Sequence, residues 1–92
     1  MIQTFANRAM ARLWDGEFVK AFSPIERAAK RKLDLLHNAK TIDDLRAPPG
    51  NRLEALAGDR RGQYSIRINN QWRICFRWTA EGPEDVEIVD YH

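Results

Sequence analysis

The stretch from Tyr64 to Trp78 constrains the fold most strongly, because apolar and polar residues alternate along it on both sides of a short polar break. Alternate side chains point to opposite faces of a β-strand, so this period of two predicts a hairpin with one apolar face and one basic face. The apolar face would carry Tyr64, Ile66, Ile68, Trp72, Ile74, Phe76 and Trp78. The other face would carry Arg67, Arg73 and Arg77, together with Ser65 and Cys75.

The phase of the alternation also predicts the loop between the two strands. A two-residue loop would place Arg67 opposite Trp72 and would mix the two faces. A three-residue loop, Asn69-Asn70-Gln71, places Arg67 opposite Arg73 and keeps the apolar side chains together on the core side, so we predict this loop. Asparagine also tolerates the left-handed backbone conformation that such a loop usually requires.

The expected arginine pair raises the question of an anionic ligand, since like charges directly opposite each other destabilise a sheet. An anion bound by Arg67 and Arg73 would explain the pair, although arginines that only solvate the outer face of a sheet explain it equally well. Segment 46–77 holds seven arginines and two carboxylates, whereas the whole chain has a net charge of only +2. Because the planar guanidinium suits phosphate oxygens, this distribution indicates a surface that binds nucleic acid.

Length and composition restrict the class of protein. With 92 residues, of which 43% are hydrophobic, we expect one domain that comprises residues 1–92. The one cysteine, Cys75, excludes an internal disulfide framework. The first residues do not resemble a signal peptide, and no apolar run reaches the roughly eighteen residues of a membrane span, so a soluble cytoplasmic protein is expected.

Two helices are predicted in the first half of the chain. Asn7 is a plausible N-cap for a helix that ends at Trp14 before Gly16. The run Ser23-Pro24-Ile25-Glu26 combines a capping serine, a proline at the first helical position and a glutamate three residues after the cap. The apolar residues of this second helix recur at helical spacing, at Ile25, Ala29, Leu33 and Leu36. We interpret its cations, Arg27, Lys30, Arg31 and Lys32, as a solvated face.

The remaining pattern predicts strands joined by short turns. Strands are expected at residues 1–5, 52–56 and 86–91 in addition to the hairpin. Arg60 and Arg61 are expected at the tip of a turn, and Gly82-Pro83 is expected to interrupt the regular structure before the last strand. The expected fold is α+β, with two N-terminal helices packed on one face of a mostly antiparallel four- to five-stranded sheet. The opposite face, with its arginine pair, would be left open.

The residues also limit the chemistry. The sequence has one cysteine and two histidines, and their spacing does not suit metal ligands, so a metal site is improbable. It also has no glycine-rich phosphate loop, which argues against a nucleotide-dependent enzyme. Metal-free RNA cleavage remains open, since it requires a base, cations beside the phosphate and an acid. Arg67 and Arg73 could supply the cations, and Asp90-Tyr91-His92 offers a carboxylate, a phenol and an imidazole. On composition alone, a frayed terminus explains these last three residues at least as well.

Several runs together resemble the HigB family of toxins, which belongs to the RelE-like (RelE/ParE) superfamily of bacterial toxin–antitoxin systems. They are Met1-Ile-Gln-Thr-Phe5, Pro48-Pro-Gly50, the segments 52–62 and 64–78, and Val86-Glu-Ile-Val-Asp-Tyr-His92. The most specific are Trp72-Arg73-Ile74 and the last three residues. The resemblance implies a RelE-like microbial RNase fold. It also implies a ribosome-dependent, metal-independent endoribonuclease that cleaves mRNA in the A site without a cofactor and inhibits translation and growth.

The resemblance further implies an active site of Arg67, Arg73, Asp90 and Tyr91. Arg73 would contact the scissile phosphate, Tyr91 would stack on or orient the nucleotide that is cut, and Asp90 would accept the proton. Additional contacts with RNA are expected from Arg52, Arg60, Arg61, Gln71 and His92.

The chain departs from the family pattern at residues 54–58, where many members carry His-Pro-Leu-Lys-Gly and this chain carries Glu-Ala-Leu-Ala-Gly. A histidine and a lysine are thus replaced by Glu54 and Ala57. Loss of a cation beside the developing negative charge costs roughly a hundredfold or more in rate. We therefore expect a weaker toxin, or one in which the loop arginines carry more of the charge, with Glu54 as an alternative base.

The partners implied by the resemblance are a HigA-type helix-turn-helix antitoxin, the ribosome with its 16S rRNA, and mRNA. Operator DNA would be bound only through the antitoxin complex, and no membrane is involved. The alternative function is a weak or inactive module that binds RNA or antitoxin and acts mainly in operon autoregulation. Direct DNA binding by this chain alone is a third interpretation, which the lack of a recognisable helix-turn-helix disfavours.

Overall fold

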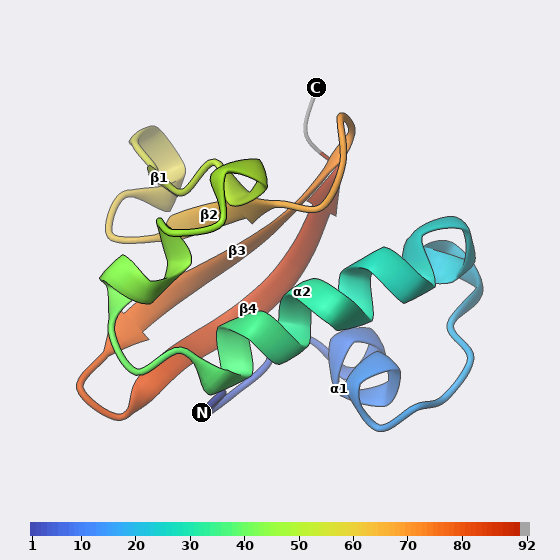
Figure 1. Ribbon diagram of the computed structural model, residues 1–92. Helices are drawn as coiled ribbons and strands as arrows, with labels where there is room; N and C mark the ends of the chain where they lie inside the picture. The colour runs from blue at the N-terminus through green and yellow to red at the C-terminus, as the bar shows by residue number, and fades with distance from the viewer. Residues whose placement is uncertain (91–92) are drawn as a thin grey trace.

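The computed structural model describes residues 1–90, which form a four-stranded antiparallel sheet with helices packed over one face (Figure 1). The helices are α1 (Arg8–Trp14) and α2 (Glu26–Asn38), and the strands are β1 (Glu54–Ala55), β2 (Tyr64–Arg67), β3 (Trp72–Thr79) and β4 (Gly82–Asp90). Four short 3-10 helices connect them: η1 (Lys20–Ile25), η2 (Ile42–Leu45), η3 (Pro49–Asn51) and η4 (Gly58–Arg60). The strands lie side by side in chain order, so the predicted α+β class is confirmed.

The hairpin of β2 and β3 has the predicted three-residue loop. Arg67 pairs with Arg73, and the backbone N–H groups of Ile68 and Asn69 donate to the Trp72 carbonyl at 2.9 and 3.2 Å. The expected left-handed conformation is wrong, because the only non-glycine residues of segment 1–90 with a positive φ are Arg52 and Asp85. Instead, the Asn69 side-chain oxygen accepts the N–H groups of residues 71 and 72, each at 2.8 Å, which shapes the loop.

The hydrophobic core lies between the sheet and the two helices. From the sheet it contains Ile66, Ile74, Phe76, Val86 and Ile88, and from the helices it contains Met10, Leu13, Ala29, Leu33 and Leu36, all of them buried. Each set follows the period of its element, two in the strands and three or four in the helices. The alternation in the sequence therefore predicted correctly which face of the hairpin is covered.

The two helices begin differently. The Asn7 side chain caps α1 as predicted by accepting the Met10 N–H at 3.0 Å. The predicted start of α2 is wrong, because Ser23 and Pro24 lie inside η1 and the α-helix begins at Glu26. Phe22 and Ile25 are both buried, and a 3-10 turn with three residues per turn places them on one face, so tertiary packing overrides the capping signal. No helix within residues 1–90 has the length and apolar character needed to cross a bilayer.

Strand β4 begins earlier than predicted, since Gly82 and Pro83 belong to it rather than breaking the chain. Gly82 has a φ of +134°, and a Cβ atom there would lie 2.2 Å from the Met1 carbonyl oxygen, so the N-terminal segment crosses directly over it. That segment forms only an isolated parallel bridge, Phe5 to Val86, instead of the predicted first strand. Three backbone hydrogen bonds still join it to β4, from the N–H groups of Gln3, Val86 and Ala6 to the carbonyls of Pro83, Thr4 and Val86 at 2.8, 3.2 and 3.0 Å. The bridge extends no further because Pro83 has no N–H and the Asp85 N–H donates to the Thr4 hydroxyl.

Candidate nucleic-acid interface

The face of the sheet that carries the arginine pair is partly covered, so the prediction of an open face is wrong. Ser65, Arg73 and Cys75 are buried on it. The segment after β1 folds over this face, and the Arg60 guanidinium forms an ion pair with Glu87 of β4 at 3.1 Å. Predicted strand 52–56 is shortened to two residues because the chain turns sharply at Arg52, whose φ is +44°. Only part of the face is therefore accessible.

Arg73 is held in place by polar contacts beneath this cover. Its Nε donates to the Ser65 hydroxyl at 2.8 Å, and its Nη2 donates to the Arg52 carbonyl at 2.6 Å and lies 3.4 Å from the Ser65 carbonyl. The same Nη2 lies 3.7 Å from the Glu54 carboxylate. Because Arg73 is only 8% exposed, these contacts fix the turn at Arg52 on the sheet and give the guanidinium a structural role.

Arg67 lies directly opposite Arg73 in the ladder but in a different environment. Its side chain is half-buried at the end of β2 and donates to the Asn70 side-chain oxygen. Within residues 1–90, no carboxylate lies within ion-pair distance of it. The predicted pair therefore consists of one arginine with a carboxylate neighbour and one without.

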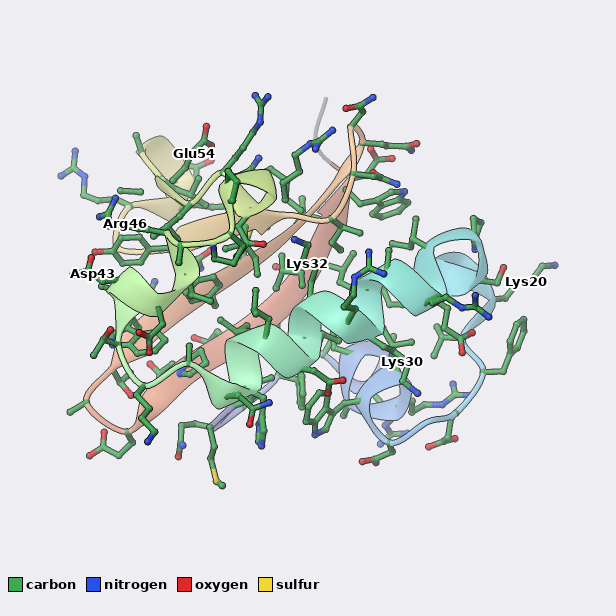
Figure 2. The ribbon with its side chains drawn as sticks, viewed as in Figure 1. Lys20, Lys30, Lys32, Asp43, Arg46 and Glu54 are labelled. Carbon is green, nitrogen blue, oxygen red and sulfur yellow. The ribbon has the colours of Figure 1, made fainter. Side chains whose placement is uncertain are left out.

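Lys32 of α2 also reaches this region, which the sequence interpretation missed. Its Nζ donates to Asn51 Oδ1 of η3, and Figure 2 shows the side chain extending from α2 toward that segment. Burial, reinforced by Arg31 and Arg67, holds the pKa of Lys32 below its usual value. The signal was available, because Lys32 lies three residues after Ala29 and four before Leu36, both buried, and so borders the apolar stripe of the helix.

The predicted RNA-binding arginines are not equivalent. Arg52 and Arg61 are exposed. Arg60 does not project from the tip of a turn as predicted, since it is half-buried and contacts both Glu87 and the Gln63 side-chain oxygen, the latter at 3.0 Å. Arg60 therefore anchors the covering segment to β4, while the other two present their charge to solvent.

The C-terminal end of β4 lies beside the hairpin loop. Asp90 pairs with Trp72 in the ladder. Paired residues share a face of the sheet, so the alternation assigns Asp90 to the helix-covered face and Arg73 to the opposite face. The Gln71 amide donates to the Asp90 carboxylate at 3.1 Å, so two predicted site residues do meet. Tyr91 and His92, also predicted for the site, lie outside the described residues.

The remaining reactive side chains of the described residues are poorly placed for catalysis. Glu54, the alternative base, is 54% exposed at its side chain and lies against Arg73. Burial raises the pKa of the Cys75 thiol, which disfavours the thiolate that a nucleophile requires. Within residues 1–90, no three His, Cys, Asp or Glu side chains lie close enough to hold a metal ion. The described groups are thus the cations around Arg67 and, at the same end of the sheet but in the phase of its other face, the exposed carboxylate of Asp90.

Comparison with known proteins places this geometry in context. Residues 3–92 match the HigB-like toxin family, described as RelE-like toxin of type II toxin–antitoxin system HigB. Over 56 residues the chain is 52% identical to toxin HigB-1 of Vibrio cholerae, which covers 61% of this chain and 59% of that protein. It is 39% identical to a protein of Haemophilus influenzae, also over 56 residues, or 61% of this chain and 55% of the relative. The matched segment thus spans less than two thirds of either relative.

The fold also has a counterpart among solved structures. The YoeB–YefM complex from Staphylococcus aureus contains a chain that superposes on this one with a TM-score of 0.65 and 21% identity. The superposition covers 100% of this chain and 95% of the other. At this identity the likeness shows the fold alone.

Proposed function

Since the chain belongs to the HigB-like family, the RelE-like toxins of type II toxin–antitoxin systems, we propose that it is a ribosome-dependent, metal-independent endoribonuclease. It would cut mRNA in the A site and so inhibit translation and growth. The observation that carries this proposal is the set of cations around Arg67 at the end of β2, with Asp90 at the end of β4 at the same end of the sheet. Cleavage of a phosphodiester requires cations at the phosphate and a base at the 2′-hydroxyl, and an RNA strand that crosses this end of the sheet would meet both.

The proposed reaction uses the ribose of the substrate as the nucleophile. Asp90 takes the proton of the 2′-hydroxyl, the 2′-oxygen attacks the adjacent phosphorus, and the bond from phosphorus to the 5′-oxygen of the next nucleotide breaks. The leaving oxygen takes a proton from an acid, a role we assign to His92. The products are a 2′,3′-cyclic phosphate and a 5′-hydroxyl end. The Gln71 amide, which contacts the Asp90 carboxylate, would orient the base.

The cationic residues have separate tasks in this proposal. Arg67 lacks a carboxylate neighbour within residues 1–90 and would stabilise the charge that develops on the phosphate oxygens. Arg73 would also contact the scissile phosphate, although Glu54 must first move away from its guanidinium. Tyr91 would stack on the nucleotide, while Arg52 and Arg61, both exposed, would bind flanking phosphates.

The proposed partners are a HigA-type helix-turn-helix antitoxin, the ribosome with its 16S rRNA, and mRNA, with operator DNA contacted through the antitoxin complex. The structural neighbour is a YoeB–YefM complex, which supports a protein partner for this fold. The charge of segment 46–77, with seven arginines against two carboxylates, supports a nucleic-acid substrate.

Primer extension on a translated mRNA tests the proposal. The wild-type protein should create new cuts that end in a 2′,3′-cyclic phosphate, and Arg67→Ala and Tyr91→Ala should each slow cutting by about a hundredfold. Arg27→Ala is the control, because it removes an exposed arginine on α2, outside the proposed site, and it should leave cutting intact. Failure of the wild type to cut, or cutting by both variants at the wild-type rate, refutes the enzymatic assignment.

One observation favours the alternative, a weak or inactive module that binds RNA or antitoxin and regulates its operon. Glu54 places a carboxylate 3.7 Å from Arg73, and residue 57 is an alanine that supplies no cation. Under this alternative, the chain should strengthen operator binding by the antitoxin while its expression alone leaves growth and mRNA intact. Co-expression with an operator-driven reporter, alongside growth curves, separates the two functions.

A further inference from the structure

Arg31, Lys32 and Arg67 form one group of cations, because the charges of Arg31 and Arg67 act on Lys32 and help to lower its pKa. Arg31 and Lys32 lie on α2, and Arg67 ends β2. Within residues 1–90, no carboxylate reaches ion-pair distance of any of the three. Ion pairs do occupy five other arginines, namely Arg12, Arg46, Arg60, Arg73 and Arg77. Ten of the fifteen lysines and arginines lie outside these ion pairs, so the missing carboxylate alone does not distinguish this group. What distinguishes it is that Lys32 is partly buried and that the charges of Arg31 and Arg67 act on it.

Buried polar contacts fix the position of Lys32. Its ammonium donates to Asn51 Oδ1, and Asn51 is fully buried with its own amide nitrogen donating to the Leu45 carbonyl at 3.2 Å. Asn51 therefore holds the ammonium against η3, which also contacts β2. An ammonium group has three donors, and Asn51 Oδ1 is the one hydrogen-bond acceptor it meets within residues 1–90.

We propose that Lys32, which Asn51 holds in place, and Arg67 form a phosphate-binding subsite for the RNA backbone. The inference rests on the proposed function for the identity of its ligand. Arg67 supplies a planar donor and Lys32 a point charge, and both groups are partly removed from solvent, which strengthens their attraction for a phosphate oxygen. Arg31, which is exposed on the same helix, adds to the local potential.

A purely structural role for Lys32 would predict a different residue. A tether to Asn51 needs only a neutral donor such as glutamine, whereas a partly buried ammonium near two guanidinium groups is electrostatically unfavourable in the free protein. The lowered pKa of Lys32 reports that cost. A bound phosphate offsets it by supplying the missing negative charge, so the cluster is better explained by a ligand than by a tether.

The test compares RNA affinities of lysine variants on one helix. The probe is a short, fluorescently labelled RNA with 2′-O-methyl riboses, which cannot be cleaved, and its affinity is measured by anisotropy across salt concentrations. Lys32→Gln should weaken binding about tenfold and reduce the slope of log affinity against log salt by about 0.7, the value for one lost phosphate contact on a single strand. Lys32→Arg should restore the wild-type slope.

Lys30→Gln is the matched control, because it removes the same charge from the same helix on a side that faces away from η3 (Figure 2). It should leave the slope unchanged. If Lys32→Gln and Lys30→Gln have equal slopes, or if the wild type shows no salt-dependent binding, the subsite is refuted. Cuts by the wild type with an unchanged Lys32→Gln slope would refute the subsite alone. A reduced slope without cuts would refute the endoribonuclease and leave the subsite standing.

Discussion

Glu54 and Arg73 form an unequal ion pair, in which the arginine side chain is 10% exposed and the glutamate side chain 54% exposed. The arginine is fixed by the Ser65 hydroxyl and the Arg52 carbonyl, so only the glutamate can leave the pair without disturbing the turn. An incoming phosphate must therefore compete with this carboxylate for the accessible edge of the guanidinium. At the residue scale, Glu54 is better placed to weaken phosphate binding than to act as the base.

We expect Glu54→Gln to increase cleavage of translated mRNA. An ion pair with one half-exposed partner contributes about 1 kcal/mol or less, so its removal should raise the rate by no more than about fivefold. Single-turnover cleavage on ribosomes programmed with one mRNA measures this change. A base would give the opposite sign, so a fall in rate would assign proton transfer to Glu54 and reject the competition. Glu17→Gln, which breaks the exposed pair with Arg12, is the control.

At the scale of elements, the register of the hairpin was predictable and the cover over Arg73 was not. Whether the loop has an even or an odd number of residues decides the register, because a shift of one residue would turn every apolar side chain of a strand to the wrong face. The burial of Arg73 depends instead on where the turn at Arg52 lies in space, and nothing local in the sequence specifies this. The cap at Asn7 was predicted correctly because it depends on a local contact with Met10. The predicted cap at Ser23 was wrong because burial of Phe22 overrides the local signal there.

The contact between β4 and the N-terminal segment leads to a prediction about stability. Gly82→Ala should lower the free energy of unfolding by about 3 kcal/mol, because alanine is strained at a φ of +134° and its Cβ would meet the Met1 carbonyl. Gly50→Ala is the matched control, since no atom lies within 4 Å of a Cβ there. It should change the free energy by less than about 0.5 kcal/mol. Equal midpoints for the two variants in urea unfolding, followed by circular dichroism, would contradict the close approach.

At the scale of the whole molecule, the proposed site is assembled from segments far apart in the sequence. Lys32 comes from α2, Arg67 from the end of β2 and Asp90 from the end of β4. The resemblance in the sequence predicted the strand residues, because they form contiguous motifs. Lys32 belongs to no motif, and only its position beside the apolar stripe of α2 marked it. For a site of this kind, the sequence predicts the residues that lie within motifs and leaves out those, such as Lys32, that do not.

The size of the molecule indicates why cleavage should depend on the ribosome. The chain measures only 30 × 28 × 26 Å between its Cα extremes, and the proposed subsite of Lys32 and Arg67 occupies one part of that surface. A surface of this size can bind only a short stretch of single-stranded RNA, on the order of 4 to 16 nucleotides for small domains. Such contacts are too few to hold a flexible strand in the geometry for in-line attack. An mRNA that is already held in position would supply the missing order.

We therefore expect the purified chain to cut an mRNA during translation and to leave the same naked mRNA intact at the same protein concentration. The difference should exceed about a hundredfold, since positioning of reactants can contribute several kcal/mol to a reaction barrier. Primer extension on one transcript, with and without ribosomes, measures both rates. Lowering the salt concentration strengthens the binding of naked RNA through its phosphates and serves as the control for simple affinity. If low salt alone brings cutting of naked mRNA to the rate seen on ribosomes, then binding limits the reaction and the ribosome is not needed for positioning.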